Sequence, residues 1–199
     1  TKVQERGILL ITDEVMTGFG RTGKMFAAEH ADIKPDIMCV AKGLTGGILP
    51  MSITLATDAI YDAFLDDDVR RAFLHGHSFT ANPIACAAAL ASLEIFDDEP
   101  VFERIGAIES VYRERFPQFE KLPAVKSTRI LGSIGVVELS GEGGYFNNIG
   151  LRLRRAFHEA GFLVRPLGTV VYTLPPYITE PSDLHRLYDH FEYLLKKGV

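Results

Sequence analysis

One acid and one lysine stand out because each comes at the end of a short apolar run. Asp13 closely follows residues 8–11, and Lys42 closely follows residues 37–40. Apolar runs of this length predict buried strands, and ligands of open α/β sheets bind beyond the carboxyl ends of strands. A carboxylate and a lysine at neighbouring strand ends suit pyridoxal 5'-phosphate (PLP). The acid pairs with the pyridinium nitrogen, and the lysine forms the Schiff base.

Each of the two charged residues has an ordinary alternative. Asp13 and the adjacent Glu14 could form a strand-to-loop junction with solvated acids, and Lys42 could be a surface lysine. Against this, glycines follow both positions, at Gly18, Gly20, Gly23, Gly43, Gly46 and Gly47. Neither group matches a complete phosphate-binding motif, so the first group predicts turns. The second group leaves backbone room beside a bulky ligand, where Lys42 could also act as general acid and base.

These segments together resemble a known family. Residues 13–23 read DEVMTGFGRTG and residues 35–47 read PDIMCVAKGLTGG, which is similar to the class III (subgroup III, ω-amino acid) aminotransferases. The resemblance implies a PLP enzyme of fold type I, an α/β fold like that of aspartate aminotransferase. It implies that Lys42 and Asp13 are catalytic and bind the cofactor, and that Val15 packs on the cofactor ring.

A third motif, HGHSFTANP, covers residues 75–83. Two histidines beside a hydroxyl could suggest a nucleophile, but no acid stands at an orienting position and no GxSxG pattern is present. In the resembling family, the hydroxyl of this motif reaches the cofactor phosphate of the neighbouring subunit. The resemblance therefore implies a homodimer, with Ser78 in cofactor binding and Gly76 in substrate binding. Ser78 replaces the commoner Thr and His77 a frequent Pro, and Thr80 is the second candidate hydroxyl.

An arginine near the C-terminus also ends an apolar stretch. Residues 162–166 predict a strand that delivers Arg165, whose planar guanidinium suits a carboxylate. A structural salt bridge is the alternative. In the resembling family, the arginine of VRP-x-G-x-x-x-Y binds the substrate carboxylate, and the tyrosine, here Tyr172, lies close to the same pocket.

Within the family, the segment around Thr45 is most similar to the biotin-pathway branch, because many other relatives carry a different small residue there. This likeness implies small-molecule substrates, with 8-amino-7-oxononanoate as acceptor and S-adenosylmethionine as the expected donor. Another ω-aminotransferase, acting on ornithine or γ-aminobutyrate, is the first alternative. A non-catalytic half that binds only a partner chain is the second. A generic nucleotide-binding α/β domain is the third, and it lacks a complete phosphate motif.

Net charge, cysteine content and hydropathy limit the classes of function that the chain could have. The 199 residues carry a net charge of −5 without a long basic run, which argues against nucleic-acid and membrane-surface partners. Cys39 and Cys86 lie in apolar surroundings without metal-ligand spacing, which favours free thiols in the cytoplasm. No signal peptide or membrane-spanning segment is predicted. The acidic run at residues 66–68 is interpreted as a solvated turn, because nothing nearby completes a metal site.

The resemblance also suggests how the chain is organised. Family members are about twice as long, so we expect a C-terminal half whose N-terminal half, with the phosphate loop and much of the substrate pocket, is missing. Residues 1–98 are expected to form the end of the large, mostly parallel-sheet PLP-binding domain. Residues 99–199 are expected to form a connecting helix, ended by Pro117, and a small α+β domain. Its last helix would be capped by Ser182.

Overall fold

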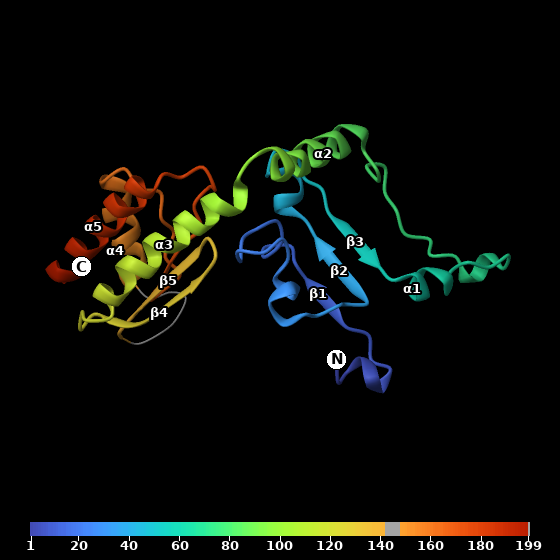
Figure 1. Ribbon diagram of the computed structural model, residues 1–199, viewed down its shortest axis with the longest axis horizontal. Coiled ribbons are helices and arrows are strands. Elements are labelled where there is room, and N and C mark those ends of the chain that lie inside the picture. Colours follow the sequence, from blue (N-terminus) through green and yellow to red (C-terminus); the bar gives the residue numbers. More distant parts are fainter. Residues whose placement is uncertain (142–147, 199) are drawn as a thin grey trace. The chain divides into compact units, whose positions relative to one another are not determined.

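The computed structural model describes residues 1–141 and 148–198. The chain divides into two compact units (Figure 1). The first unit comprises Thr1–Gly20 and Lys24–Pro100, and the second comprises Arg21–Gly23 and Val101–Val199. The short segment Arg21–Gly23 therefore packs with the second unit, although its sequence neighbours on both sides belong to the first.

The first unit is organised on a three-stranded sheet with the order β1-β2-β3. β1 (Ile11–Asp13) is parallel to β2 (Ile37–Val40), and β2 is antiparallel to β3 (Ile53–Ala56). The expectation of a buried strand at residues 8–12 is wrong. β1 starts later and is an edge strand, and Ile11 is 59% exposed because no described element covers it.

Helical segments connect these strands and close the unit: η1 (Gln4–Arg6), η2 (Ala27–Ala31), η3 (Lys42–Thr45), α1 (Asp58–Asp62), η4 (Val69–Arg71) and α2 (Pro83–Asp98). α2 starts where the Asn82 side chain accepts the backbone N–H groups of Ile84 and Ala85, at 2.9 and 3.3 Å. Pro83 takes the first helical position, where a missing N–H costs nothing. α2 packs on η3, and the buried core of the unit consists of Phe19, Val40, Leu44 and Ala89.

The second unit combines an antiparallel sheet with three helices. The sheet has the order β4-β5-β6, and the elements are α3 (Val101–Phe119), β4 (Val125–Leu131), β5 (Ile134–Leu139), α4 (Asn148–Glu159), β6 (Val170–Thr173) and α5 (Pro181–Lys197). α3 packs against β4, β5 and α5, and α4 packs against α5 (Figure 1). Alternate residues of β5 are buried, as expected for a strand with one covered face. In the part of the chain that the structure describes, no helix is both long and apolar enough to cross a membrane.

Two expected helix boundaries in this unit are wrong. α3 continues past Pro117 to Phe119. A proline removes one helical hydrogen bond, but the residues after it keep theirs, and burial of Phe116 and Phe119 favours continuing the turn. α5 begins at Pro181, with Glu180 at the cap position, so Ser182 lies inside the first turn and does not cap it.

Hydroxyl groups join the elements of the second unit inside its core. The Tyr112 hydroxyl on α3 donates to the Ser133 carbonyl oxygen at 3.2 Å. The Thr173 hydroxyl on β6 donates to the Gly135 carbonyl oxygen at 3.3 Å, which leaves it to accept from the Tyr188 hydroxyl at 2.7 Å. Burial raises the pKa of Tyr112 from the ordinary 10.0 to about 12, and burial also raises the pKa of Tyr188 well above its ordinary value. The network is therefore held in its neutral form.

This network predicts a loss of stability at alkaline pH. The pKa of Tyr112 is higher in the folded chain, so its stabilising effect is complete below pH 10 and disappears as the pH rises towards 12. The loss from Tyr112 approaches about 3 kcal/mol. Tyr112→Phe should cost about 1 kcal/mol at neutral pH, because the Ser133 carbonyl loses its donor, and should then lose less stability on alkaline titration. Urea unfolding between about pH 8 and about pH 12 measures both effects, and identical pH slopes would contradict the assignment.

Candidate functional site

β1 and β2 bring Asp13 and Lys42 to the same edge of the first sheet. The strands are parallel, Asp13 is in register with Cys39, and the Glu14 backbone N–H donates to the Cys39 carbonyl oxygen at 2.8 Å. Lys42 follows shortly after Cys39 as the first residue of η3. Both side chains are exposed, and Asp13 Oδ1 accepts the backbone N–H of Val15 at 3.0 Å. The acid and the lysine thus stand at the carboxyl ends of neighbouring parallel strands.

The turn that carries Lys42 is firmly held and has an unusual backbone. Lys42 has a φ of 43°, in the left-handed region that residues other than glycine rarely adopt. The Ser92 hydroxyl on α2 donates to the Gly43 carbonyl oxygen at 3.1 Å. The buried Thr45 hydroxyl donates to the Leu49 carbonyl oxygen at 2.6 Å. The backbone of the turn is therefore fixed by tertiary contacts while the lysine side chain points to solvent.

The geometry fits a pyridine cofactor that is attached through an amine. Within residues 1–141 and 148–198, no carboxylate forms an ion pair with the Lys42 ammonium, so this amine is not used in a salt bridge. A Cβ placed on Gly47 would meet no heavy atom within 4 Å, and one on Gly46 would meet only the Ser92 hydroxyl, at 3.9 Å. The turn after Lys42 therefore opens onto free space.

Glu14 differs from its neighbour Asp13 in a way that the sequence analysis missed. Glu14 is only 2% exposed. One carboxylate oxygen accepts the Ala28 N–H at 2.8 Å, and the other accepts the Ala27 N–H at 3.0 Å and the Thr17 hydroxyl. The alternation of side chains along a strand could have revealed this difference, because consecutive strand residues point to opposite faces of the sheet. An acid that faces a ligand implies that the next acid is turned inward.

The segment at residues 75–83 forms an exposed turn before α2. The His77 N–H donates to the Thr80 hydroxyl oxygen at 3.0 Å, and the Phe79 N–H donates to His77 Nδ1 at 3.2 Å. Thr80 is thus engaged within the turn. Gly76 and Ser78 are exposed, and the Ser78 hydroxyl has no hydrogen-bond partner among the residues that the structure describes. This hydroxyl remains available to a group outside the turn.

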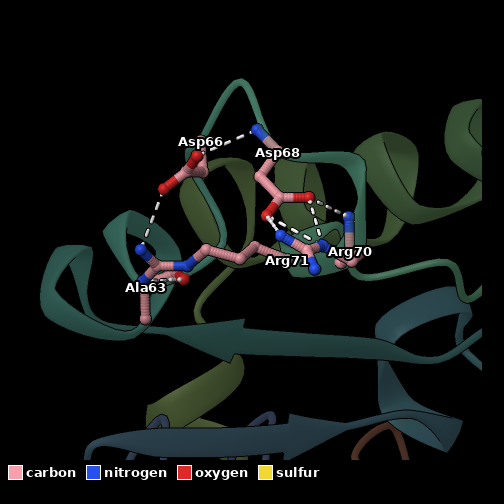
Figure 2. Close-up of polar contacts among 5 residues, drawn as sticks. All are labelled: Ala63, Asp66, Asp68, Arg70 and Arg71. Carbon is pink, nitrogen blue, oxygen red and sulfur yellow. Dashed lines mark hydrogen bonds and ion pairs between the residues drawn. The ribbon is translucent and has the colours of Figure 1, made fainter.

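Two residues of the acidic run before this segment, Asp66 and Asp68, pair with arginines that follow closely in the chain (Figure 2). Asp68 accepts the backbone N–H of Arg70 at 3.0 Å and faces its guanidinium, and Arg71 donates to Asp66 at 2.9 Å. The hydrogen bonds from Arg70 lower the pKa of Asp68 below its usual value. The described parts of the chain contain no group of His, Cys, Asp and Glu that could hold a metal ion. These exposed pairs order the turn and add little stability.

The second unit contains Arg165 and Tyr172. The expected strand at residues 162–166 is not formed: these residues have no strand pairing, the Val164 N–H donates to the Phe162 carbonyl oxygen at 3.1 Å, and the nearest bridge joins Leu167 to Val170. Arg165 is exposed and has no ion-pair partner in the described residues, so the alternative of a structural salt bridge is not realised there. Tyr172 is half-buried on β6.

Arg21–Gly23 contacts the second unit through its backbone and one side chain. The Ser133 N–H donates to the Arg21 carbonyl oxygen at 3.0 Å, and the Arg21 guanidinium donates to the Pro175 carbonyl oxygen at 2.8 Å. The same guanidinium lies 4.7 Å from the centre of the Tyr177 ring. The sequence pattern predicts turns here and carries no signal for these contacts, because the partners lie far along the chain.

The tight approach of Gly23 to the β4–β5 turn predicts an intolerant glycine. Gly132 has a φ of 56°, and a Cβ there would lie 2.2 Å from the Gly23 nitrogen, a backbone atom that cannot move aside cheaply. Gly161 has a φ of 85°, but a Cβ there would meet no heavy atom within 4 Å. A substitution at Gly161 therefore measures the cost of backbone strain without a steric clash. Gly161→Ala should cost about 1 kcal/mol, and Gly132→Ala at least about 3 kcal/mol. Equal losses in urea unfolding would show that the contact is loose.

Comparisons with known proteins show the family to which the chain is similar. A family model described as "Aminotransferase class-III" matches residues 2–195. Adenosylmethionine-8-amino-7-oxononanoate aminotransferase of Synechococcus elongatus is 48% identical over 188 residues, which are 94% of this chain and 44% of that protein. The crystal structure of the enzyme of that name from Methanocaldococcus jannaschii superimposes with a TM-score of 0.91 at 36% identity, covering 98% of this chain and 47% of that one.

A structure with a different name is also similar. Acetylornithine aminotransferase from Elizabethkingia anophelis superimposes with a TM-score of 0.84 at 29% identity and covers 98% of this chain and 47% of that one. The chain spans less than half the length of the curated relatives it matches. The fold is therefore common to several aminotransferases with different names.

Proposed function

The chain belongs to the class III aminotransferases, which are PLP-dependent enzymes of fold type I, and on this basis we propose that it carries the lysine-bearing part of a PLP site. The proposed reaction of the complete enzyme transfers an amino group to 8-amino-7-oxononanoate and yields 7,8-diaminononanoate. S-adenosylmethionine is the proposed donor. The names of the curated relatives support this choice of substrates.

The observation that carries the proposal is the placement of Asp13 and Lys42 at the ends of neighbouring parallel strands. Bound PLP supplies an electron sink for the carbanion that forms when the substrate carbon loses its proton. The Asp13 carboxylate would hold the proton on the ring nitrogen. The Lys42 amine would attach the cofactor covalently and, once released, move a proton to and from the reacting carbon. Val15, which is half-buried and follows Asp13 by two residues, would pack on the ring.

The remaining site residues have proposed roles in binding. Arg165 would pair with the acceptor carboxylate, and Tyr172 would line the same pocket. Ser78 would donate its hydroxyl to the cofactor phosphate across a homodimer interface, with Gly76 beside the substrate. The exposed Ser78 hydroxyl and the exposed, unpaired Arg165 guanidinium support these roles within the described residues. A cytoplasmic location belongs to the same proposal.

Selective modification of Lys42 tests the cofactor role directly. The chain is incubated with PLP, reduced with borohydride and digested, and the pyridoxyl adduct is located by mass spectrometry. We expect the adduct mainly on Lys42, because its turn is preformed. Lys34→Arg, which removes an exposed lysine of the same unit, should leave the yield unchanged, whereas Lys42→Arg should remove the main adduct.

Label scattered over the surface lysines would contradict a preformed half-site in this chain. Repeating the labelling on a protein of full family length then decides between two explanations. Selective label only in the longer protein would mean that its other half completes the pocket. Scattered label there as well would favour the non-catalytic alternative.

The carboxylate role of Arg165 predicts a loss of acceptor affinity in a protein of full family length. Arg165→Ala should raise KM for 8-amino-7-oxononanoate about 30-fold, the equivalent of about 2 kcal/mol, and Arg165→Lys should recover part of it. An acceptor analogue whose carboxylate is replaced by a neutral amide is the matched control and should not distinguish wild type from Arg165→Ala. Unchanged acceptor affinity in Arg165→Ala would remove this role.

A second candidate is another ω-aminotransferase activity, which the similarity to acetylornithine aminotransferase favours. The two candidates share the chemistry of Asp13 and Lys42 and differ in the acceptor. A competition between 8-amino-7-oxononanoate and the semialdehydes of ornithine-type reactions, measured as relative kcat/KM, distinguishes them.

A further inference from the structure

Glu14 lies beside the candidate site, and the proposed chemistry gives it no task. Its carboxylate is buried, and its oxygens accept hydrogen bonds from the backbone of Ala27 and Ala28 and from Thr17. No lysine, arginine or histidine of residues 1–141 and 148–198 forms an ion pair with it. A buried charge is costly unless hydrogen bonds compensate it, so this carboxylate stabilises one conformation of the chain around it.

These hydrogen bonds join the two ends of one loop. Glu14 directly follows β1, and Ala27 and Ala28 begin η2, so the carboxylate closes the segment between residues 14 and 28. The Gly18 N–H also donates to the Glu14 carbonyl oxygen at 2.9 Å, which tightens the first turn of this loop. Glu14 therefore ties the two ends of the loop together, while Arg21–Gly23 in its middle packs with the second unit.

Phe19 lies between the loop and the lysine turn and contacts Gly43. Phe19 lies inside the closed loop with a φ of 58° and is 5% exposed. Its ring packs edge-on against Phe26, with 5.7 Å between the ring centroids. A Cβ placed on Gly43 would lie 2.8 Å from Phe19 Cβ and 3.0 Å from Cδ2, so the aromatic residue fills the space directly beside Gly43.

The residue before Gly43 is Lys42, whose left-handed backbone carries a strain of about 1–2 kcal/mol. Such a conformation persists only when the surrounding structure enforces it. Phe19 on one side of Gly43 and the hydrogen bond from Ser92 to the Gly43 carbonyl oxygen provide that constraint. If Phe19 moved, the turn could relax, and the Lys42 amine would leave its position relative to Asp13.

We propose that Glu14 is a positioning residue for Lys42: by closing the loop at residues 14–28, it holds Phe19 against Gly43 and so fixes the direction in which the Lys42 side chain leaves the turn. The inference rests on the proposed function in one respect, namely that the position of Lys42 matters for cofactor attachment. The structural link itself does not depend on that function.

Amide hydrogen exchange of the 199-residue chain tests the link without any cofactor. The reporters are the N–H groups of the lysine turn that are bonded within it, those of Leu44, Gly46 and Gly47. Glu14→Gln replaces an acceptor oxygen with an amide N–H₂ group that faces backbone donors, so the loop should open. We expect about tenfold faster exchange in this turn as well as in the loop.

Asp36→Asn is the matched control. The Asp36 carboxylate also accepts a backbone N–H of the same unit, that of Leu10 at 2.7 Å, and a side-chain donor, Gln4. Both donors lie in the N-terminal segment before β1, outside the loop at residues 14–28, so Asp36→Asn should leave exchange in the lysine turn within about twofold of wild type. Phe19→Leu tests the relay without touching the carboxylate, and should speed exchange in the turn even if Glu14→Gln folds poorly.

A second measurement on the same proteins connects the inference to the cofactor. In wild type the pyridoxyl label should fall mainly on Lys42, and in Glu14→Gln and Phe19→Leu the share on Lys42 should drop about tenfold while the other lysines keep theirs. Faster exchange confined to residues 15–28, with an unchanged lysine turn in both variants, would overturn the positioning role. Unselective label in wild type together with faster exchange in the turn would refute the cofactor assignment and leave the positioning link standing.

Discussion

The parallel pairing of β1 with β2 is the constraint on which the candidate site depends. It sets Asp13 opposite Cys39 and brings the lysine turn to the same sheet edge. Because side chains alternate along a strand, a shift of one residue would turn Asp13 inward and present Glu14 in its place. The two adjacent acids therefore cannot exchange roles: one faces solvent, where a ligand could bind, and the other is committed to hydrogen bonds inside the unit.

A carboxylate is a suitable group for that inner position because the start of η2 presents backbone N–H groups without helical partners. Glu14 accepts two of them and the Thr17 hydroxyl. An apolar side chain of similar size would leave these donors buried and unsatisfied, at a cost of about 1–3 kcal/mol each. The loop is thereby fixed by directional bonds, whereas the small apolar core of this unit, centred on Phe19, Val40, Leu44 and Ala89, is not directional.

Local features of the chain were predictable from sequence, and contacts between distant segments were not. The apolar runs sufficed to predict strands that end at Asp13 and shortly before Lys42, and the resemblance of the motifs implied the fold class. The packing of Phe19 on Gly43 and the hydrogen bond from Ser92 link residues far apart in sequence, for which periodicity carries no signal. Propensity also misled where tertiary packing decides: α3 passes Pro117 because Phe119 is buried, and the apolar residues before Arg165 do not form a strand.

The proposed roles separate chemistry from recognition along the chain. The acid and the lysine belong to the first unit, and the arginine and tyrosine proposed for the substrate belong to the second. Chemistry common to the family needs a fixed strand register and a constrained lysine turn, which tolerate little change. Recognition in this proposal needs only the exposed guanidinium of Arg165 and the side chain of Tyr172. Substitutions at these two positions need not disturb the strand register of the first unit. This proposed division would let one fold serve relatives named for 8-amino-7-oxononanoate and for acetylornithine: a change of acceptor need not alter Asp13, Lys42 or the residues proposed to position the lysine.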